Sequence, residues 1–114
     1  MSTDVRALRA QHVAMLETEL PRIVEELKGL GAQLIVLFGS YAQGRRDLFT
    51  DLDLLVVMES EEPFVERLSH VYATLGPKVA ADILVYTPEE FEQMKQRRFV
   101  RHAMATGKVL YARG

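Results

Sequence analysis

The chain has 114 residues, 48% hydrophobic and 26% charged, with a formal net charge of −2 and no cysteine. These values are typical of an ordinary globular protein, and the length predicts one domain over residues 1–114. The absence of cysteine excludes disulfides and thiolate metal sites, and the negative net charge argues against direct nucleic-acid binding.

Apolar residues recur at spacings of three and four between positions 5 and 30, which predicts one face of a long helix. Pro21 lies within this pattern. Because an interior proline loses a hydrogen bond and clashes with the preceding turn, we expect a kink or two consecutive helices there. Gly29 and Gly31 then indicate the end of the helical region.

Two apolar runs in the next part of the chain predict strands. Residues 34–38 lie between glycines and favour a strand covered on both faces, and residues 52–58 predict a second strand. Between them, residues 41–45 predict a short helix or turn and residues 44–50 a polar loop. Neither run approaches the ~20 residues of a membrane helix, and the first four residues show no signal-peptide pattern, so we expect a cytoplasmic protein without membrane contacts.

The alternation of helix and strand continues in the second half of the chain. An amphipathic pattern over residues 64–75 predicts a helix that ends at Gly76, and residues 79–86 predict a third strand.

A strong helix start follows at Thr87-Pro88-Glu89-Glu90, with a cap residue, a proline and two acids. We expect one helix from there towards Gly107 and a short last strand at residues 109–111. The whole order favours an α/β (α+β) fold with a small mixed β-sheet flanked by helices.

Two aspartates, Asp51 and Asp53, stand at the start of the second predicted strand. Side chains alternate across a strand, so both point to one face, about 6.5–7 Å apart along the chain. Two carboxylates at this separation repel each other, and a divalent cation that takes one oxygen from each removes the repulsion. Mg²⁺ favours such a pair together with substrate phosphates. On its own, an Asp-x-Asp pair usually marks only a solvated strand end.

A third acid, Asp82, interrupts the apolar strand predicted over residues 79–86. An ionised aspartate in the middle of an apolar strand requires a cationic partner or a metal. If this strand lies beside the second one, Asp82 projects next to Asp51 and Asp53, and three acids on neighbouring strands suit a two-metal phosphoryl-transfer site. The alternative is a buried pair with an arginine.

Gly39 and Ser40 supply a candidate phosphate site upstream of the acids. Glycine permits close approach of the backbone, a following helix start offers free N–H groups, and the Ser40 hydroxyl can donate to a phosphate oxygen. Arg45 and Arg46 follow this turn and are candidates to grip a triphosphate, with a solvated loop as an equal alternative.

The last predicted helix is basic, with Lys95, Arg97, Arg98, Arg101 and His102. This pattern is typical of a solvated face and also fits a docking surface for an acidic partner or RNA. The histidines lack ligand spacing and are interpreted as ordinary surface or boundary residues.

The run Phe38-Gly39-Ser40-Tyr41-Ala42-Gln43-Gly44 with Asp51-Leu52-Asp53-Leu54-Leu55-Val56 resembles the signature of the DNA polymerase β-like nucleotidyltransferase superfamily. Within it, the chain is most similar to the minimal nucleotidyltransferase group. The resemblance covers nearly the whole chain, with Asp82 as the third acid. Thr50 departs from the pattern, because serine commonly precedes the first aspartate.

The resemblance implies a nucleotidyltransferase (polymerase β palm-like) fold, with an NTP bound at Gly39 and Ser40. It implies two Mg²⁺ ions, or Mn²⁺, held by Asp51, Asp53 and Asp82, and a base function for Asp82. The implied reaction transfers AMP from ATP to a hydroxyl, with pyrophosphate as the leaving group.

Many members of the group are encoded beside a helical HEPN partner as toxin–antitoxin pairs, in which the nucleotidyltransferase adenylylates the toxin. We therefore expect a HEPN-type partner protein as acceptor, and either that partner or a homodimer to complete the site. The alternative is a non-catalytic antitoxin that occludes its partner.

Overall fold

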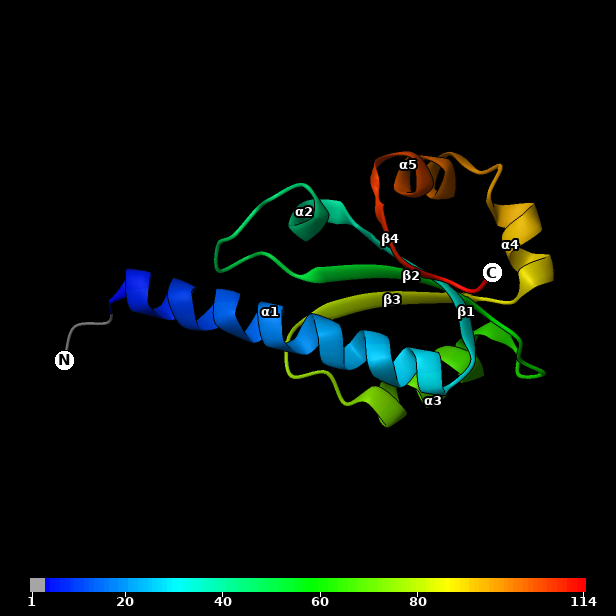
Figure 1. Cartoon of the computed structure of the whole chain (residues 1–114), viewed down its shortest axis with the longest axis horizontal. Helices are drawn as coiled ribbons and strands as arrows, with labels where there is room; N and C mark the ends of the chain where they lie inside the picture. The colour runs from blue at the N-terminus through cyan, green and yellow to red at the C-terminus, as the bar shows by residue number, and fades with distance from the viewer. Residues whose placement is uncertain (1–3) are drawn as a thin grey trace.

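The computed structural model describes residues 4–114; the first three residues, part of the segment without a signal pattern, lie outside this range. Within it, helices alternate with strands except at α4 and α5, which follow one another (Figure 1). In chain order the elements are α1 (Val5–Gly29), β1 (Ala32–Phe38), α2 (Gly39–Ala42), β2 (Leu52–Met58), α3 (Phe64–Leu75), β3 (Ala81–Tyr86), α4 (Pro88–Met94), α5 (Arg98–Thr106) and β4 (Lys108–Ala112). No helix in the described range is long and apolar enough to cross a membrane.

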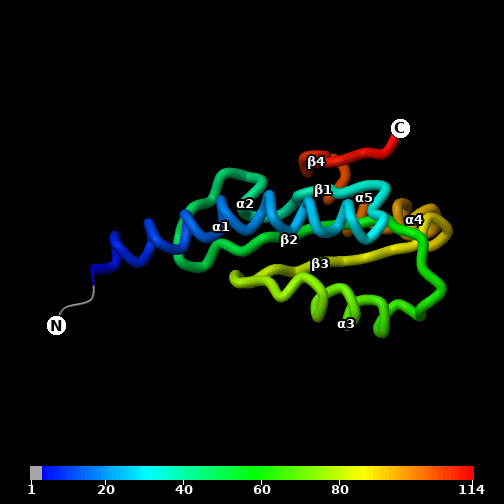
Figure 2. The backbone as a smooth tube through the Cα atoms, turned by 60° about the horizontal axis from the view of Figure 1, so that its bottom comes forward, coloured from blue at the N-terminus to red at the C-terminus, as the bar shows by residue number. Residues whose placement is uncertain are grey.

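The four strands form one mixed sheet with the order β3-β2-β1-β4. β1 runs antiparallel to both β2 and β4, whereas β2 and β3 are parallel. The connection from β2 to β3 contains α3, which runs alongside β3 in Figure 2. The predicted small mixed sheet flanked by helices is therefore confirmed.

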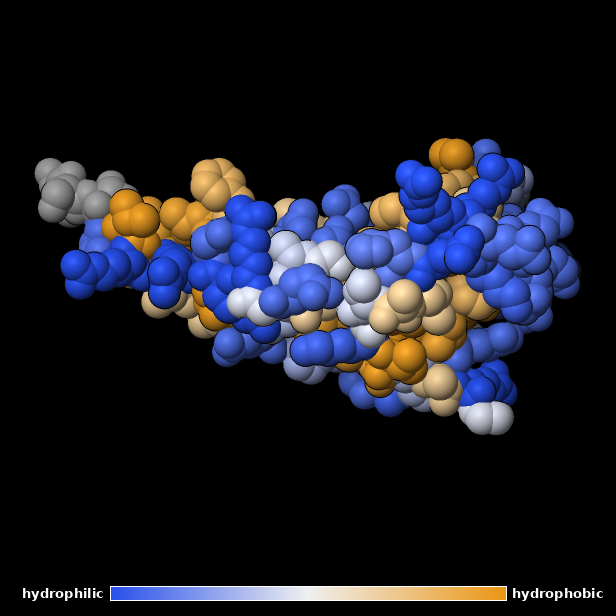
Figure 3. Space-filling view, turned by 90° about the horizontal axis from the view of Figure 1, so that it is seen from above, coloured by the Kyte–Doolittle hydropathy of each residue, from blue (hydrophilic) through white to orange (hydrophobic). Residues whose placement is uncertain are grey.

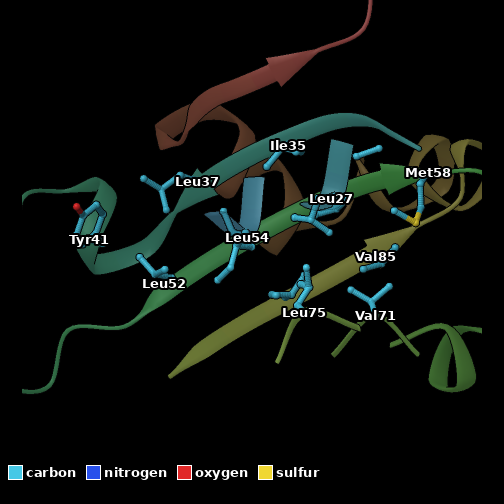
Figure 4. Packing of buried hydrophobic residues seen from close by; sticks show 14 of the residues in the cluster. Leu27, Ile35, Leu37, Tyr41, Leu52, Leu54, Met58, Val71, Leu75 and Val85 are labelled. Carbon is cyan, nitrogen blue, oxygen red and sulfur yellow. The ribbon is translucent and has the colours of Figure 1, made fainter. Parts of the chain in front are cut away.

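Side chains of alternating residues in β2 fill two apolar clusters, one on each face of the sheet. Leu54 and Val56 pack with residues of α1 and α3, and Figure 4 shows Leu27, Leu54 and Val71 in this first cluster. Leu55 and Val57 face the other way, towards α4 and α5. Because each fully buried aliphatic side chain contributes about 1.5–3 kcal/mol, the central strands contribute strongly to the stability of the fold.

Helix α1 is one continuous helix of 25 residues that includes Pro21, so of the two alternatives expected there, a kink or two consecutive helices, the second is wrong. Leu16 and Ile23, on either side of the proline, are both fully buried against the sheet. Pro21 itself is exposed. Apolar burial on both sides offsets the ~3 kcal/mol that an interior proline costs.

The basic C-terminal region forms two helices, α4 and α5, in place of the single helix expected from Thr87 to Gly107. Arg97 has an extended backbone and separates them. The break turns the chain so that Met94 of α4 and Val100 of α5 pack on the same apolar cluster. Local helix signals could not reveal this change of direction, because it depends on the surface beneath.

A buried arginine ties α3 to the start of α4. Arg67 is 3% exposed, and its guanidinium donates to the Val85 carbonyl at 2.8 Å and to both carboxylate oxygens of Glu90 at 2.6 and 3.2 Å. Glu90 also completes a capping box with Thr87. The Arg67 guanidinium lowers the pKa of Glu90, so this carboxylate stays ionised in the fold.

Candidate active site

The structure brings Asp51, Asp53 and Asp82 together at one end of the sheet. Parallel pairing of β2 and β3 places Asp53 directly beside Asp82, and Asp51 immediately precedes β2. One carboxylate oxygen from each residue lies within 4.8 Å of the other two. The two strands that carry these acids are therefore neighbours, as the prediction for Asp82 required.

The burial of the acids differs from the sequence expectation. β3 begins at Ala81, two residues later than predicted, so Asp82 lies near the start of the strand and is exposed. Asp51 and Asp53 are half-buried. The sequence argument placed Asp82 in the middle of an apolar strand. In the structure, burial instead acts on Asp53, whose pKa it raises.

Burial and the negative charges of Asp51 and Asp82 raise the pKa of Asp53 to about 6. None of the ion pairs formed within residues 4–114 includes any of the three acids. The cluster therefore carries uncompensated negative charge. Carboxylate oxygens are the donors that Mg²⁺ and Mn²⁺ prefer, so the donor set fits a divalent cation.

Gly39 belongs to the turn that we predicted to bind phosphate, here called the phosphate turn, and it lies against this cluster. It follows β1 directly with a φ of +76°, a left-handed conformation that glycine adopts easily. A β-carbon at this position would come within 2.9 Å of Cγ of Asp53. Ser40 follows in α2 and is half-buried. The predicted turn and the predicted acids thus share one end of the sheet.

Arg45 and Arg46 make their contacts within their own loop. Nε of Arg45 donates to Asp47 at 2.6 Å, and this ion pair lowers the pKa of Asp47. Arg46 donates to the Tyr41 carbonyl at 2.8 Å and lies 3.5 Å from the centroid of the Tyr41 ring. Neither arginine lines the cavity beside the acids.

His12, which sequence reasoning interpreted as a boundary residue, contacts the loop that leads into the acids. Its Nε2 lies 2.7 Å from the Thr50 carbonyl oxygen, and because a carbonyl only accepts, this nitrogen donates. Thr50 is 1% exposed, and its hydroxyl accepts a hydrogen bond from the backbone N–H of Asp47. The bond from α1 therefore fixes the backbone next to Asp51. No sequence signal indicates a contact across 38 positions.

A cavity of about 910 Å³ opens beside the acids and reaches α5. Phe38 and Phe99 meet edge to face in it, with ring centroids 5.6 Å apart. The Tyr72 hydroxyl holds the start of β3 by accepting from the Ile83 N–H and donating to the Ala81 carbonyl. The lining residues are Phe38, Gly39, Gln43, Asp53, Leu68, Tyr72, Asp82, Ile83, Leu84, Phe99, His102, Ala103 and Thr106.

Sequence reasoning assigned none of the aromatic lining residues to the site. Phe99 and Tyr72 follow helical spacing in the sequence, which is the ordinary signal of core residues. Only the packing of α5 and α3 around β3 brings them to the acids.

Comparison with known proteins gives a family match over most of the chain. Residues 18–106 match the family described as "Nucleotidyltransferase domain". No curated protein matches the chain significantly.

Crystal structures described as toxin–antitoxin complexes are similar in fold. A chain of a mutant MntA-HpeT toxin–antitoxin is 21% identical with a TM-score of 0.50, and the match covers 84% of this chain and 72% of that one. A chain of a toxin–antitoxin crystallised with AMP-PNP is 23% identical with a TM-score of 0.49, over 81% and 72% of the two chains.

Proposed function

This chain belongs to the nucleotidyltransferase domain family, and on that premise we propose that it transfers AMP from ATP to a hydroxyl group of a partner protein. The observation that carries the proposal is the convergence of three carboxylates within 4.8 Å, beside a left-handed glycine turn. Uncompensated acids next to a glycine turn that lets the backbone come close suit a metal-bound polyphosphate.

We assign the binding roles from the positions of the residues. Gly39 and Ser40 would hold the triphosphate, and Asp51, Asp53 and Asp82 would hold Mg²⁺ or Mn²⁺. The metal, when bound, supplies positive charge that stabilises the charge developing on the phosphates. Arg45 remains a candidate phosphate contact only if it leaves Asp47, and Arg46 only if it leaves Tyr41.

Asp82 is the proposed base. It is the exposed member of the cluster, on the edge strand β3, where an acceptor can approach it. In the proposed step the acceptor oxygen forms a bond to the α-phosphorus while its proton passes to the Asp82 carboxylate. The bond between the α-phosphorus and the oxygen leading to the β-phosphate breaks, and pyrophosphate leaves.

The acceptor we propose is a HEPN-type toxin. The fold similarity to a chain of a toxin–antitoxin complex supports a toxin as the partner, and the HEPN type follows from the sequence resemblance. Exposed apolar side chains, such as Phe49 at 82% and Phe99 at 56%, favour a protein partner. The same residues also favour the second candidate function, an antitoxin that occludes its toxin without chemistry. A homodimer is the alternative way to complete the site.

The test mixes the full chain, a purified HEPN-type toxin and MgCl₂ with ATP labelled either at the α- or at the γ-phosphate. We expect label on the toxin from α-labelled ATP only, because pyrophosphate carries the γ-phosphate away. Asp53→Asn should abolish labelling and neutralisation while toxin binding persists. Neutralisation that survives Asp53→Asn would instead establish occlusion.

A further inference from the structure

One face of β3 carries a row of residues that leads away from the acids. Side chains two positions apart lie on the same face of a strand, so Asp82, Leu84 and Tyr86 follow one another there. Their register partners in β2 are Asp53, Leu55 and Val57, which belong to the face covered by α4 and α5. The row therefore connects the acid cluster to the apolar cluster under α4.

Two cavities follow this row and meet. The cavity of about 910 Å³ at the acids and a second one of about 610 Å³ share Leu84 and Phe99 in their linings. Beyond these two residues, Phe64, Tyr86 and Met94 line the second cavity, together with Gln93 and with Glu90, whose carboxylate Arg67 holds. We call this continuous groove, from Asp82 past Leu84 and Phe99 to Phe64, Tyr86 and Met94, the β3 groove.

The β3 groove leaves apolar surface uncovered. Phe99 is 56% exposed although it stands at the junction of the two cavities, and Leu84, Phe64 and Met94 are only half-buried. Hydrophobic patches interrupt a mostly hydrophilic surface on the side of the molecule that carries α5 (Figure 3). Aliphatic and aromatic residues side by side in a groove suit apolar side chains of a partner.

Positive charge lies on α5 beside the β3 groove, in a hollow next to the residues that line the groove itself. Arg98 and Arg101 are exposed and take part in no ion pair within the described residues. His102 lines the acid cavity and also a neighbouring hollow with both arginines. From residue 93 to the end, the sequence contains no Asp or Glu. This basic surface of α5 is therefore complementary to acidic side chains of a partner that extend beyond the groove, whereas Asp53, Asp82 and Glu90 line the groove itself.

The topology places the groove on the acceptor side of the site. Gly39 follows β1, Asp53 lies in β2 and Asp82 lies in the edge strand β3, so these groups follow the strand order across the sheet. A triphosphate at Gly39 leaves the β3 side open to the acceptor. The β3 groove begins at this side.

We infer that the β3 groove binds an amphipathic, acidic segment of the acceptor protein and so presents the acceptor hydroxyl to Asp82. The inference rests on the proposed function. The apolar side chains of the segment occupy the groove around Leu84 and Phe99, and its acidic side chains face Arg98 and Arg101. A nucleic acid fits less well, because Phe64 and Tyr86 already stack on each other, with centroids 5.7 Å apart, and so offer fewer free ring faces to bases.

Fluorescence anisotropy with defined peptides on the full chain tests the inference. The probe is a labelled synthetic helix of about 15 residues, with leucine on one face and glutamate on the other. A second peptide carries lysine in place of glutamate, and a single-stranded RNA oligonucleotide is the competitor. We expect the glutamate peptide to bind at least about tenfold more tightly than the lysine peptide, with affinity falling as salt rises.

The variant Phe99→Ser should weaken binding of the glutamate peptide about tenfold, which is about 1.4 kcal/mol. Its matched control is Val109→Ser, since Val109 is 58% exposed and lies in β4 at the opposite edge of the sheet. Three results would each overturn the inference. The two peptides could bind equally well, Phe99→Ser could leave the affinity for the glutamate peptide unchanged, or the RNA could displace that peptide.

Titration of MgATP into Arg98→Ala and Asp53→Asn separates this inference from the proposed function. Arg98 is exposed and lies outside the acid cavity, so Arg98→Ala should bind MgATP like the unchanged protein and the glutamate peptide more weakly. Asp53→Asn should lose MgATP and still bind the glutamate peptide. If the unchanged protein does not bind MgATP, only the proposed function is contradicted. If it binds MgATP but not the glutamate peptide, only the inference is contradicted.

Discussion

Gly39 and Asp53 are in direct contact: the left-handed backbone of the glycine, with φ of +76°, passes so close to the aspartate that a β-carbon would come within 2.9 Å of its Cγ. The turn after β1 thus forms one wall around the carboxylate of β2. Only a residue without a side chain leaves both the turn and the carboxylate in place. The phosphate turn and the acid cluster are therefore one unit.

Gly39→Ala should reduce Mg²⁺ and ATP affinity at least tenfold, because the added carbon displaces the Asp53 carboxylate. The control is Gly44→Ala, since Gly44 also has a positive φ of +97° but open space around it. Both variants should lose about 1 kcal/mol of unfolding free energy from backbone strain, and only Gly39→Ala should lose affinity. Calorimetry and thermal unfolding measure the two effects. Equal affinity loss in both variants would mean that backbone strain, and not the contact with Asp53, is responsible.

In the metal-free protein, the contribution of Asp53 to the free energy of unfolding should fall as pH rises from about 4 to about 6. The pKa of Asp53 is about 6 in the fold against 3.8 for the free side chain, so this residue binds more protons in the native than in the unfolded state in this window. The stability that its protonated form contributes is therefore lost with rising pH. Urea unfolding in EDTA should show that Asp53→Asn, relative to the unchanged protein, gains stability across this range. A pH-independent difference would contradict the raised pKa.

Magnesium should raise the melting temperature, because the cation binds the folded acid cluster and relieves its repulsion. Asp51→Asn should reduce this increase strongly. The control Glu61→Gln removes one exposed negative charge outside the cluster and should leave the increase unchanged. If Asp51→Asn and Glu61→Gln behave alike in thermal scans with and without MgCl₂, the cation is not bound at the cluster.

His12→Ala should lower the unfolding free energy by about 1 kcal/mol and weaken Mg²⁺ binding severalfold, because the loop before Asp51 loses its hydrogen bond at the Thr50 carbonyl. His12→Gln keeps a donor and should recover part of the affinity. His70→Ala removes an exposed histidine of α3 and serves as the control. Unchanged Mg²⁺ affinity in His12→Ala would restrict the residue to a purely structural role.

Arg67→Ala should lower the unfolding free energy by about 3 kcal/mol or more, because it removes a buried guanidinium that binds Glu90 and the Val85 carbonyl. Arg101→Ala, an exposed arginine of α5 without an ion pair in the described residues, should change stability by no more than about 0.5 kcal/mol. Chemical denaturation of the two variants measures the contrast. Similar losses would show that Arg67 contributes little beyond ordinary helix packing.

Local signals in the sequence predicted much of the fold. The bounds of β2 and α3 agree with the predicted 52–58 and 64–75, because an unbroken apolar run and a clear helical spacing each identify one type of element. The break between α4 and α5 was not predictable in this way, and the sequence left open whether α1 continues through Pro21. Both depend on the apolar surface that the elements cover after folding.

The candidate site was predictable in its acids and its glycine turn but not in its surroundings. Three acids, Asp51, Asp53 and Asp82, stand out in the sequence because they flank or interrupt apolar strands. A carboxylate in such a position requires a cationic partner or a metal. Asp53 lies beside Asp82 because β2 and β3 are parallel neighbours in this register. The sequence alone did not determine that these two strands are neighbours. The cavity lining from α3 and α5, and the contact of His12 with Thr50, arise only from tertiary packing.

The most direct test of the account is a calorimetric titration of the purified full chain with ATP, with and without Mg²⁺, beside the double variant Asp51→Asn/Asp53→Asn. The account predicts ATP binding that requires Mg²⁺ and disappears in the double variant, because the metal joins the phosphates to the two carboxylates. Unchanged Mg²⁺-dependent ATP binding in the double variant would contradict it.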